Sequence, residues 1–401
     1  MRQNINRILI ITIVISLGTT IAGGFLSKEA IAYGIDTHAF ITDVSIEFFN
    51  KNFPNKKVSD DLASYIIDGS RKEDDTPRWL NHFYDPVNNR GLHDGIYRGQ
   101  NSKIWVNDSN SQKKLVYRII PSDIASILDS SQFAKIGTFT KQTDFTWQSA
   151  IDLYARGETE KSLYALGHVI HLIEDSSVPD HTRNDAHPPF DDGGSPYEDW
   201  TGRIEFSKSI SDLEKRLIDK KAILFNDLNK YFDNIANYSN NNFFSKDSVN
   251  KYEHPVIKKY IDKGDFTYAM GIDNENNEIK LYKMVIVGSL LSGTKKNLIF
   301  DDLEIMNGYW NLLSVKAIQH VAGVMDLFFK EAEEAKAKYE LEKVRRPLLG
   351  QLVSGFSSLF SLTESRDVGM DIRSLSKPVA VSNVIITEPP KTESPRPSPT
   401  K

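Results

Sequence analysis

The chain has 401 residues, of which 40% are hydrophobic and 26% are charged, a composition typical of a globular protein with one or two domains. Its formal net charge of −5 lacks the basic excess that a dedicated duplex-DNA-binding protein carries. Because it contains no cysteine, disulfide bonds, a thiol nucleophile and a lipid-modified cysteine anchor are all excluded.

The N-terminus has the pattern of an export signal. Two arginines precede the apolar run 8–17, which is too short to span a bilayer, and residues 30–32 form a small-x-small cleavage site. Cleavage there would make Tyr33 the first mature residue. An earlier cleavage after Ala22 would instead leave 23–32 as a short propeptide. Either way, we expect a secreted protein.

The next segments place metal-binding residue types at the ends of amphipathic runs. His38 begins a run whose apolar residues continue to Phe49. Asp74 and Asp75 close the segment DGSRKEDD, and His82 begins HFYDP, in which Asp-Pro favours a turn. These residue types suit zinc and similar metals.

Residues 145–156 and 158–174 read as two helices that break at Gly157. The second leads into His171-x3-Asp175-x5-His181. On a helix, His171 and Asp175 share one face, and Pro179 ends the helix so that His181 can fold back over its end. A histidine and an aspartate on one helical face are often only a surface or core pair. With His38, Asp74, His82 and, downstream, Glu198 in SPYEDW, however, the set predicts a metal site.

Helical periodicity returns at 209–237 and 310–343, whereas 87–140 and 238–254 are polar and predicted to be loops or insertions. Four further histidines are interpreted as follows: His93 as exposed, His168 as a supporting or packing residue, His254 and His320 as structural.

The C-terminal part changes character beyond residue 335. Residues 332–346 are charged and predicted helical, 347–362 form a short apolar segment, and 387–401 are rich in proline, serine and threonine and are predicted to be disordered. We therefore expect a signal peptide at 1–32, one all-α multi-helix domain at 33–335 built around a zinc cluster, and a tail at 336–401.

The motifs resemble those of the zinc-dependent phospholipase C and single-strand-specific nuclease superfamily, in its bacterial, exported branch. The resemblance covers about residues 33–335. It rests on Tyr33-GIDT-His38, Gly69-SRKE-Asp74, His82-FYDP, His171-LIE-Asp175-SSVPD-His181, Glu198 and the helical stretch 315–329. It implies an all-α fold around a cluster of two or three zinc ions.

The resemblance also implies the ligand sets. One zinc would be held by His38, Asp175 and the terminal amino nitrogen and carbonyl oxygen of Tyr33. A second would be held by Asp74, His82, His171 and Asp175, with Asp175 bridging the two ions. A third would be held by His181 and Glu198.

One position departs from the family pattern. The family places a histidine four residues before the third-zinc carboxylate, where this chain has Gly194. His187 is the preferred substitute ligand, and Asp185, Asp191 and Asp192 are alternatives from the same loop. A cluster with only two metal ions remains an alternative.

The sequence thus predicts an exported zinc-dependent phosphoric ester hydrolase of phospholipase C type, acting on phospholipid head groups through a metal-bound hydroxide. Asp74 would serve as a ligand, as a catalytic base or as both, with Asp75 as the substitute if the register shifts by one. Alternatives are a single-strand nuclease or nucleotidase of the same fold, and a non-catalytic zinc-binding exported protein with an incomplete cluster. We expect a monomer that contacts membrane surfaces transiently and does not bind duplex nucleic acid.

Overall fold

The computed structural model describes residues 35–75, 78–95, 97–114, 144–186, 194–204, 206–289 and 293–361. Two units are distinguished, one up to Glu342 and one from Lys343 onward. The predicted signal peptide, Tyr33, His187, Asp191, Asp192 and the tail beyond 361 lie outside the described residues.

Helices dominate the described residues, which confirms the prediction of a mainly helical fold. The longer ones are α2 (Ile35–Asn52), α3 (Asp60–Glu73), α8 (Trp147–Ala155), α9 (Thr159–Asp175), α12 (Phe206–Leu217), α13 (Leu228–Asn242) and α14 (Leu303–Ser361). The shorter ones are η1 (Pro54–Lys56), η2 (Arg78–Asn81), α4 (Ser102–Trp105), α5 (Ser109–Lys113), α10 (Pro179–Thr182) and α11 (Pro196–Thr201).

Two antiparallel sheets, which the sequence reading did not anticipate, accompany the helices. A small one pairs β1 (His93–Asp94) with β2 (Tyr97–Arg98). The larger has the order β3-β4-β5-β6, formed by β3 (Lys259–Asp262), β4 (Thr267–Ile272), β5 (Glu278–Ser289) and β6 (Gly293–Ile299). The β4–β5 turn is fixed by Asp273, whose Oδ1 accepts hydrogen bonds from the backbone of Glu275 and Asn277.

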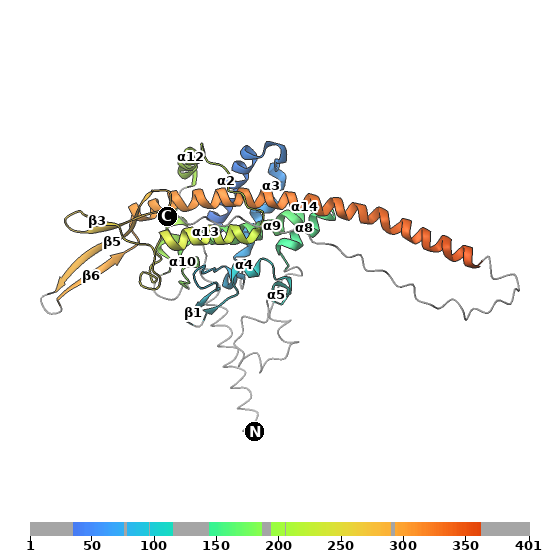
Figure 1. The fold of residues 1–401 in the computed structure, drawn as a ribbon. Coiled ribbons are helices and arrows are strands. Elements are labelled where there is room, and N and C mark those ends of the chain that lie inside the picture. The colour runs from blue at the N-terminus through green and yellow to red at the C-terminus, as the bar shows by residue number, and fades with distance from the viewer. Residues whose placement is uncertain are drawn as a thin grey trace, which may run out of the picture. The chain divides into compact units, whose positions relative to one another are not determined.

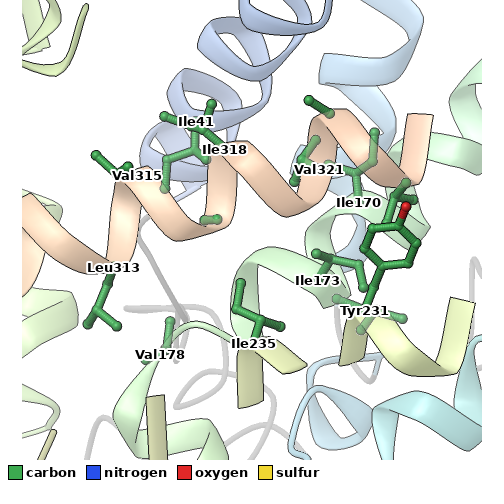
Figure 2. Close-up of a cluster of buried hydrophobic side chains, with 14 of the residues drawn as sticks. Ile41, Ile170, Ile173, Val178, Tyr231, Ile235, Leu313, Val315, Ile318 and Val321 are labelled. Carbon is green, nitrogen blue, oxygen red and sulfur yellow. The ribbon is translucent and has the colours of Figure 1, made fainter. Parts of the chain in front are cut away.

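The first part of α14, from Ile305 to Ala332, lies in the hydrophobic core. Figure 2 shows Val315, Ile318 and Val321 of α14 in one apolar cluster with Ile41 of α2, while Ile170 and Ile173 of α9 and Ile235 of α13 belong to the same cluster. The stretch Leu303–Arg345 is long and apolar enough to cross a membrane, but 78% of its most apolar window is buried inside the protein, as expected of a core helix. The predicted domain boundary at residue 335 falls within α14.

The periodic stretch 209–237 forms two helices rather than one. The Asp227 side chain accepts a hydrogen bond from the Asn229 backbone and begins α13 anew. The linker before it packs on α14: Ile223 donates its backbone N–H to the Gln319 carbonyl at 3.0 Å. A Cβ on Gly323 would lie 1.8 Å from the Ile223 carbonyl oxygen, so this close approach requires glycine.

The helices α3 and α9 touch backbone to backbone through two glycines. A Cβ on Gly69 would lie 2.0 Å from the Tyr164 carbonyl oxygen, and a Cβ on Gly167 would lie 2.1 Å from the Ile66 carbonyl oxygen. This contact brings the C-terminal end of α3, with Asp74, next to the face of α9 that carries His171. It therefore positions the candidate site.

Candidate metal centre

The end of α9 supplies the centre of the site. His171 and Asp175 lie one helical turn apart, and both side chains are fully buried. Pro179 opens the short helix α10, which carries His181 back toward Asp175. His38 comes from the first turn of α2. The prediction that these residues lie together thus agrees with their placement.

The Asp175 carboxylate is surrounded by four imidazoles. Its Oδ1 lies 3.3 Å from His38 Nε2 and 3.6 Å from His181 Nδ1. Its Oδ2 lies 2.9 Å from His82 Nδ1 and 3.1 Å from His171 Nε2. One carboxylate therefore faces ligand-type nitrogens on both of its oxygens, the arrangement needed for a bridge between two ions.

Asp74 adds a second carboxylate from the C-cap of α3. Its Oδ1 lies 3.4 Å from His171 Nε2 and 3.6 Å from His82 Nδ1. Two overlapping sets of potential ligand atoms result, one from His38, Asp74 and His171 and one from His82, His171 and Asp175, each within 4.8 Å. The neighbouring Asp75 is exposed and pairs with Lys72. Asp74, not Asp75, thus faces the cluster.

The carboxylate oxygens of Asp74 and Asp175 fit a metal. Both side chains are buried, yet none of these four oxygens accepts a hydrogen bond from a described residue. A buried carboxylate in that state costs several kcal/mol unless a cation compensates it. Ligands about 2.0–2.1 Å from a tetrahedral zinc ion lie roughly 3.3 Å from one another, close to the spacings observed here. Buried histidine and carboxylate groups of this chain could therefore bind metal.

The outer nitrogens of three histidines are each held by a second residue. His38 Nδ1 hydrogen-bonds Glu174 Oε2 at 2.6 Å, and His171 Nδ1 bonds the Ser70 carbonyl at 2.8 Å. His82 Nε2 bonds the Glu73 carbonyl at 3.2 Å. Each ring thus donates outward and turns its other nitrogen toward Asp175, which is how metal-binding histidines are oriented in proteins.

His181 lies between two carboxylates. Its Nε2 is 3.1 Å from Glu198 Oε1, while its Nδ1 faces Asp175. Glu198 sits in the first turn of α11, where Ser195 Oγ accepts a hydrogen bond from the Glu198 backbone N–H. The predicted pairing of His181 with Glu198 is thus present in space.

The backbone at Gly194, where the family has the third-site histidine, disfavours any residue with a side chain. Gly194 has φ +77°, a conformation that residues with a Cβ rarely adopt. Asp185, one of the suggested substitutes, uses its Oδ2 to accept the Asp247 backbone N–H. The substitutes His187, Asp191 and Asp192 lie outside the described residues.

A buried ionic network supports the site and was not foreseen, except for the supporting role of His168. The Glu73 carboxylate contacts Arg78 Nε at 2.6 Å, His168 Nδ1 at 2.5 Å and Trp105 Nε1 at 2.9 Å. Burial opposes the charged form of Glu73, but Arg78 and His168 outweigh it, so the pKa of Glu73 is lowered. Burial lowers the pKa of His168 to about 4 against the effect of Glu73. The network anchors the turn that joins Asp74 to His82.

Within the cluster, opposite charges stabilise each other: the carboxylate form of Asp175 and the protonated form of His38 are both favoured. Burial would raise the pKa of Asp175, but His181 and His171 outweigh it, so the pKa lies well below its usual range. Burial and His171 lower the pKa of His38, but Asp175 and Glu174 outweigh both and raise it. A bound cation would take the place of the protons on these imidazoles.

The remaining described histidines lie away from the cluster. His93 and His254 are exposed, as was expected for His93. His320 is buried in α14 with hydrogen bonds to the Lys316 carbonyl and the Asn234 side chain, in line with a structural role.

Fold and site together define a mainly helical protein with a buried histidine and carboxylate cluster that could bind metal. No family model matches the chain, and no curated protein matches it either. Among solved structures, the chain is similar to the alpha toxin from Clostridium absonum, with 15% identity and a TM-score of 0.35. The similarity covers 76% of this chain and 65% of the toxin chain, so it spans just under two thirds of the toxin.

Proposed function

We propose that this protein is an exported zinc-dependent phosphodiester hydrolase of phospholipase C type. One observation carries the proposal: three buried histidines are each hydrogen-bonded through one ring nitrogen to a supporting residue and turn the other ring nitrogen toward the shared carboxylate of Asp175. Such a set of neutral imidazoles and carboxylates matches the ligand preference of zinc.

The ligand roles are proposed as follows. His38 and Asp175, with the amino terminus of a chain beginning at Tyr33, would hold one ion. Asp74, His82, His171 and Asp175 would hold a second, and His181 with Glu198 would contribute to a third. A bound zinc pair lowers the pKa of water and neutralises charge on phosphate oxygens, the two needs of phosphodiester hydrolysis.

The protein's own side chains would orient the attacking water, accept its proton and exclude solvent. Asp74 carries two oxygens that accept no hydrogen bond from described residues, so one of them is available to orient a water molecule or to accept its proton. Burial of the cluster limits competing solvent and strengthens each electrostatic interaction within it. The Glu73 network keeps Asp74 and His82 in register.

A head-group phosphodiester of a phospholipid is the proposed substrate, because HFYDP resembles the phospholipase branch. The short spacing from Tyr33 to His38 favours the second candidate, a single-strand nuclease. Gly194 in place of a histidine favours the third, a zinc-binding protein without activity.

Metal analysis with a paired assay tests these candidates. We expect the purified mature protein to contain two or three equivalents of zinc and to release phosphocholine from phosphatidylcholine. Asp175→Asn, which keeps the shape but removes the charge of the bridge, should lose zinc and activity together. The matched control Asp75→Asn, at the exposed neighbour of Asp74, should keep both.

Each other result selects a different conclusion. Cleavage of single-stranded DNA without phosphatidylcholine hydrolysis would support the nuclease. Zinc binding with neither activity would support the non-catalytic protein. Full zinc content in Asp175→Asn would overturn the metal centre itself.

A further inference from the structure

The larger sheet ends in a hairpin that is apolar and exposed. Near the helical part, β5 is buried at Leu281 and Tyr282. Further along the strand, Ile286 is 58% exposed and Val287 is 48% exposed. Figure 1 shows β5 and β6 extending together beyond the helices that surround the core. Burial in the described protein therefore does not account for the apolar residues of the distal hairpin.

Both faces of the distal hairpin are apolar. Side chains of consecutive strand residues point to opposite faces, so Ile286 lies on one face and Val287 on the other. On the first face, Leu298 of β6, 39% exposed, continues the apolar surface beside Ile286. A single protein partner would cover one face, whereas an apolar medium would surround both. This two-sided pattern favours a lipid phase.

A lysine lies opposite each exposed apolar residue of distal β5. The register pairs Ile286 with Lys296 and Val287 with Lys295, so each of these two apolar side chains has a lysine directly beside it on the same face. Both lysines are exposed, and neither forms an ion pair with a described residue. A lysine can bury its methylene stem in the interface while its ammonium group reaches the phosphates.

The charge of this segment differs from that of the whole chain. Residues 279–300 contain four lysines and no acidic residue, whereas the chain has a net charge of −5. The two lysines nearer the helices have carboxylate partners, since Lys280 contacts Glu304 and Lys283 contacts Asp302. Only the distal pair is left for an external anion.

A second copy of the chain is a poorer occupant than lipid. In the sheet order, β6 has only β5 as a neighbour, and its outer edge could pair with another strand. Adjacent lysines on an edge strand oppose such pairing, because two copies would bring like charges together. The same lysines attract anionic phosphates.

We propose that the distal hairpin, defined as Met284–Val287 of β5 with Lys295–Leu298 of β6, docks on an anionic lipid surface. Ile286, Val287 and Leu298 enter the boundary between head groups and acyl chains, and Lys295 and Lys296 bind lipid phosphates. The proposal deepens the proposed function, because a phospholipid substrate lies at such a surface. The docking itself does not require hydrolysis.

Vesicle binding of the full mature protein tests the proposal. Sedimentation with vesicles of phosphatidylglycerol and phosphatidylcholine should show binding that weakens as salt rises, and binding to pure phosphatidylcholine should be weaker. The pair Ile286→Ser and Val287→Ser, and separately the pair Lys295→Glu and Lys296→Glu, should each weaken binding at least about tenfold. The matched control pair Val87→Ser and Ile218→Ser, at residues 60% and 73% exposed elsewhere, should bind like the unaltered protein.

Two further readouts separate the explanations. Thermal unfolding and hydrolysis of a small soluble phosphodiester, bis(p-nitrophenyl) phosphate, should be unchanged in both hairpin variants, because the hairpin does not contact the metal cluster. Equal vesicle binding by all variants would overturn the docking proposal. So would the finding that the unaltered protein is a dimer and that either pair of hairpin substitutions converts it to a monomer. If the unaltered protein does not hydrolyse the soluble ester, the proposed function is overturned, and the vesicle-binding result is unaffected.

Discussion

At the scale of single residues, the site depends on side chains that do not touch the proposed ions. Glu174 immediately precedes Asp175, but its side chain reaches the opposite way to His38 and Thr42. Its Oε2 accepts a hydrogen bond from His38 Nδ1 and thereby leaves Nε2 as the nitrogen that faces Asp175. The choice of nitrogen on His38 is thus made by Glu174.

Replacing Glu174 should weaken metal binding without removing a ligand. In Glu174→Leu, His38 Nδ1 loses its acceptor and the ring is free to turn, so we expect zinc affinity to fall about 10- to 100-fold. Glu174→Gln retains an acceptor oxygen and should recover much of that loss. Competition with a chromophoric zinc chelator measures both variants. Unchanged affinity in Glu174→Leu would mean that Glu174 is only a packing residue.

His320 provides a pH effect that is separate from the cluster. Burial lowers its pKa to about 4 from a value of 6.5, so the folded protein holds the neutral ring. The unfolded chain takes up a proton below pH 6.5, while the folded chain does so only near pH 4. Its contribution to stability is therefore complete above pH 6.5 and is lost as the pH falls toward 4.

The expected loss is about 3 kcal/mol between pH 7 and pH 4. Urea unfolding of the unaltered protein and of His320→Gln over this range measures it, because other titrating groups are common to both. Glutamine can hydrogen-bond the Lys316 carbonyl but does not titrate, so the variant should have the flatter profile. Parallel profiles would show that His320 is not neutral in the fold.

At the scale of elements, the glycine contact between α3 and α9 sets the distance between the two halves of the site. Gly167→Ala should displace α3, because its Cβ would lie 2.1 Å from the Ile66 carbonyl oxygen and 2.7 Å from the Ser70 nitrogen. The Ser70 carbonyl is also the support of His171. We expect a loss of about 3 kcal/mol in unfolding free energy together with weaker zinc binding.

Gly308→Ala is the matched control for that change. A Cβ at Gly308 meets no atom within 4 Å, and alanine is the better helix former by about 1 kcal/mol, so this variant should be equally or more stable. Chemical denaturation of both proteins checks the pair. Equal stability of Gly167→Ala and the unaltered protein would contradict the close contact.

Element prediction from the sequence succeeded where periodicity was long and uninterrupted. The helices predicted at 145–156 and 158–174 are α8 and α9, within two residues at each end. The stretch 209–237 has an almost unbroken helical period of apolar residues, although it folds as two helices. The break comes from the cap at Asp227 and from the contact of the preceding linker with α14, neither of which interrupts the apolar period. Tertiary packing, not propensity, divides it.

The four-stranded sheet was missed for a different reason. Residues 278–289 read as EIKLYKMVIVGS, where the base is buried and the distal part is exposed, so no single alternation of apolar and polar residues runs along the strand. At the site, ligand types and spacing could be read from the sequence. The residues that orient the histidines, Ser70, Glu73 and Glu174, could not be predicted from the sequence. Ser70 and Glu73 act through their backbone carbonyls, which any residue type has.

At the scale of the whole molecule, buried charge links metal binding to folding. The cluster buries the carboxylates of Asp74 and Asp175 in the interior between α3 and α9. Without cations, these groups rely on the surrounding imidazoles alone. The stability of the entire helical body should therefore depend on metal.

Chelation should lower the unfolding temperature by on the order of 10 °C, if free zinc is about a thousandfold above its dissociation constant. Differential scanning calorimetry with and without a chelator measures the shift, and added zinc should restore it. Asp175→Asn should unfold near the chelated temperature in both conditions. A fully demetallated protein with an unchanged transition would break the link between metal and fold.

The position of α14 in the chain has a consequence for the order of events during synthesis. His38, the first described residue of the cluster, leaves the ribosome early, and Glu198, the last, is made more than a hundred residues before α14 begins at Leu303. Yet α14 packs against α2 and α9, the helices that carry His38, His171 and Asp175. The candidate ligands of a nascent chain are thus synthesised well before the helix that covers them. Under the proposed function, we therefore expect stable metal binding only once α14 is present to close the core, which would make metal loading a late event in maturation.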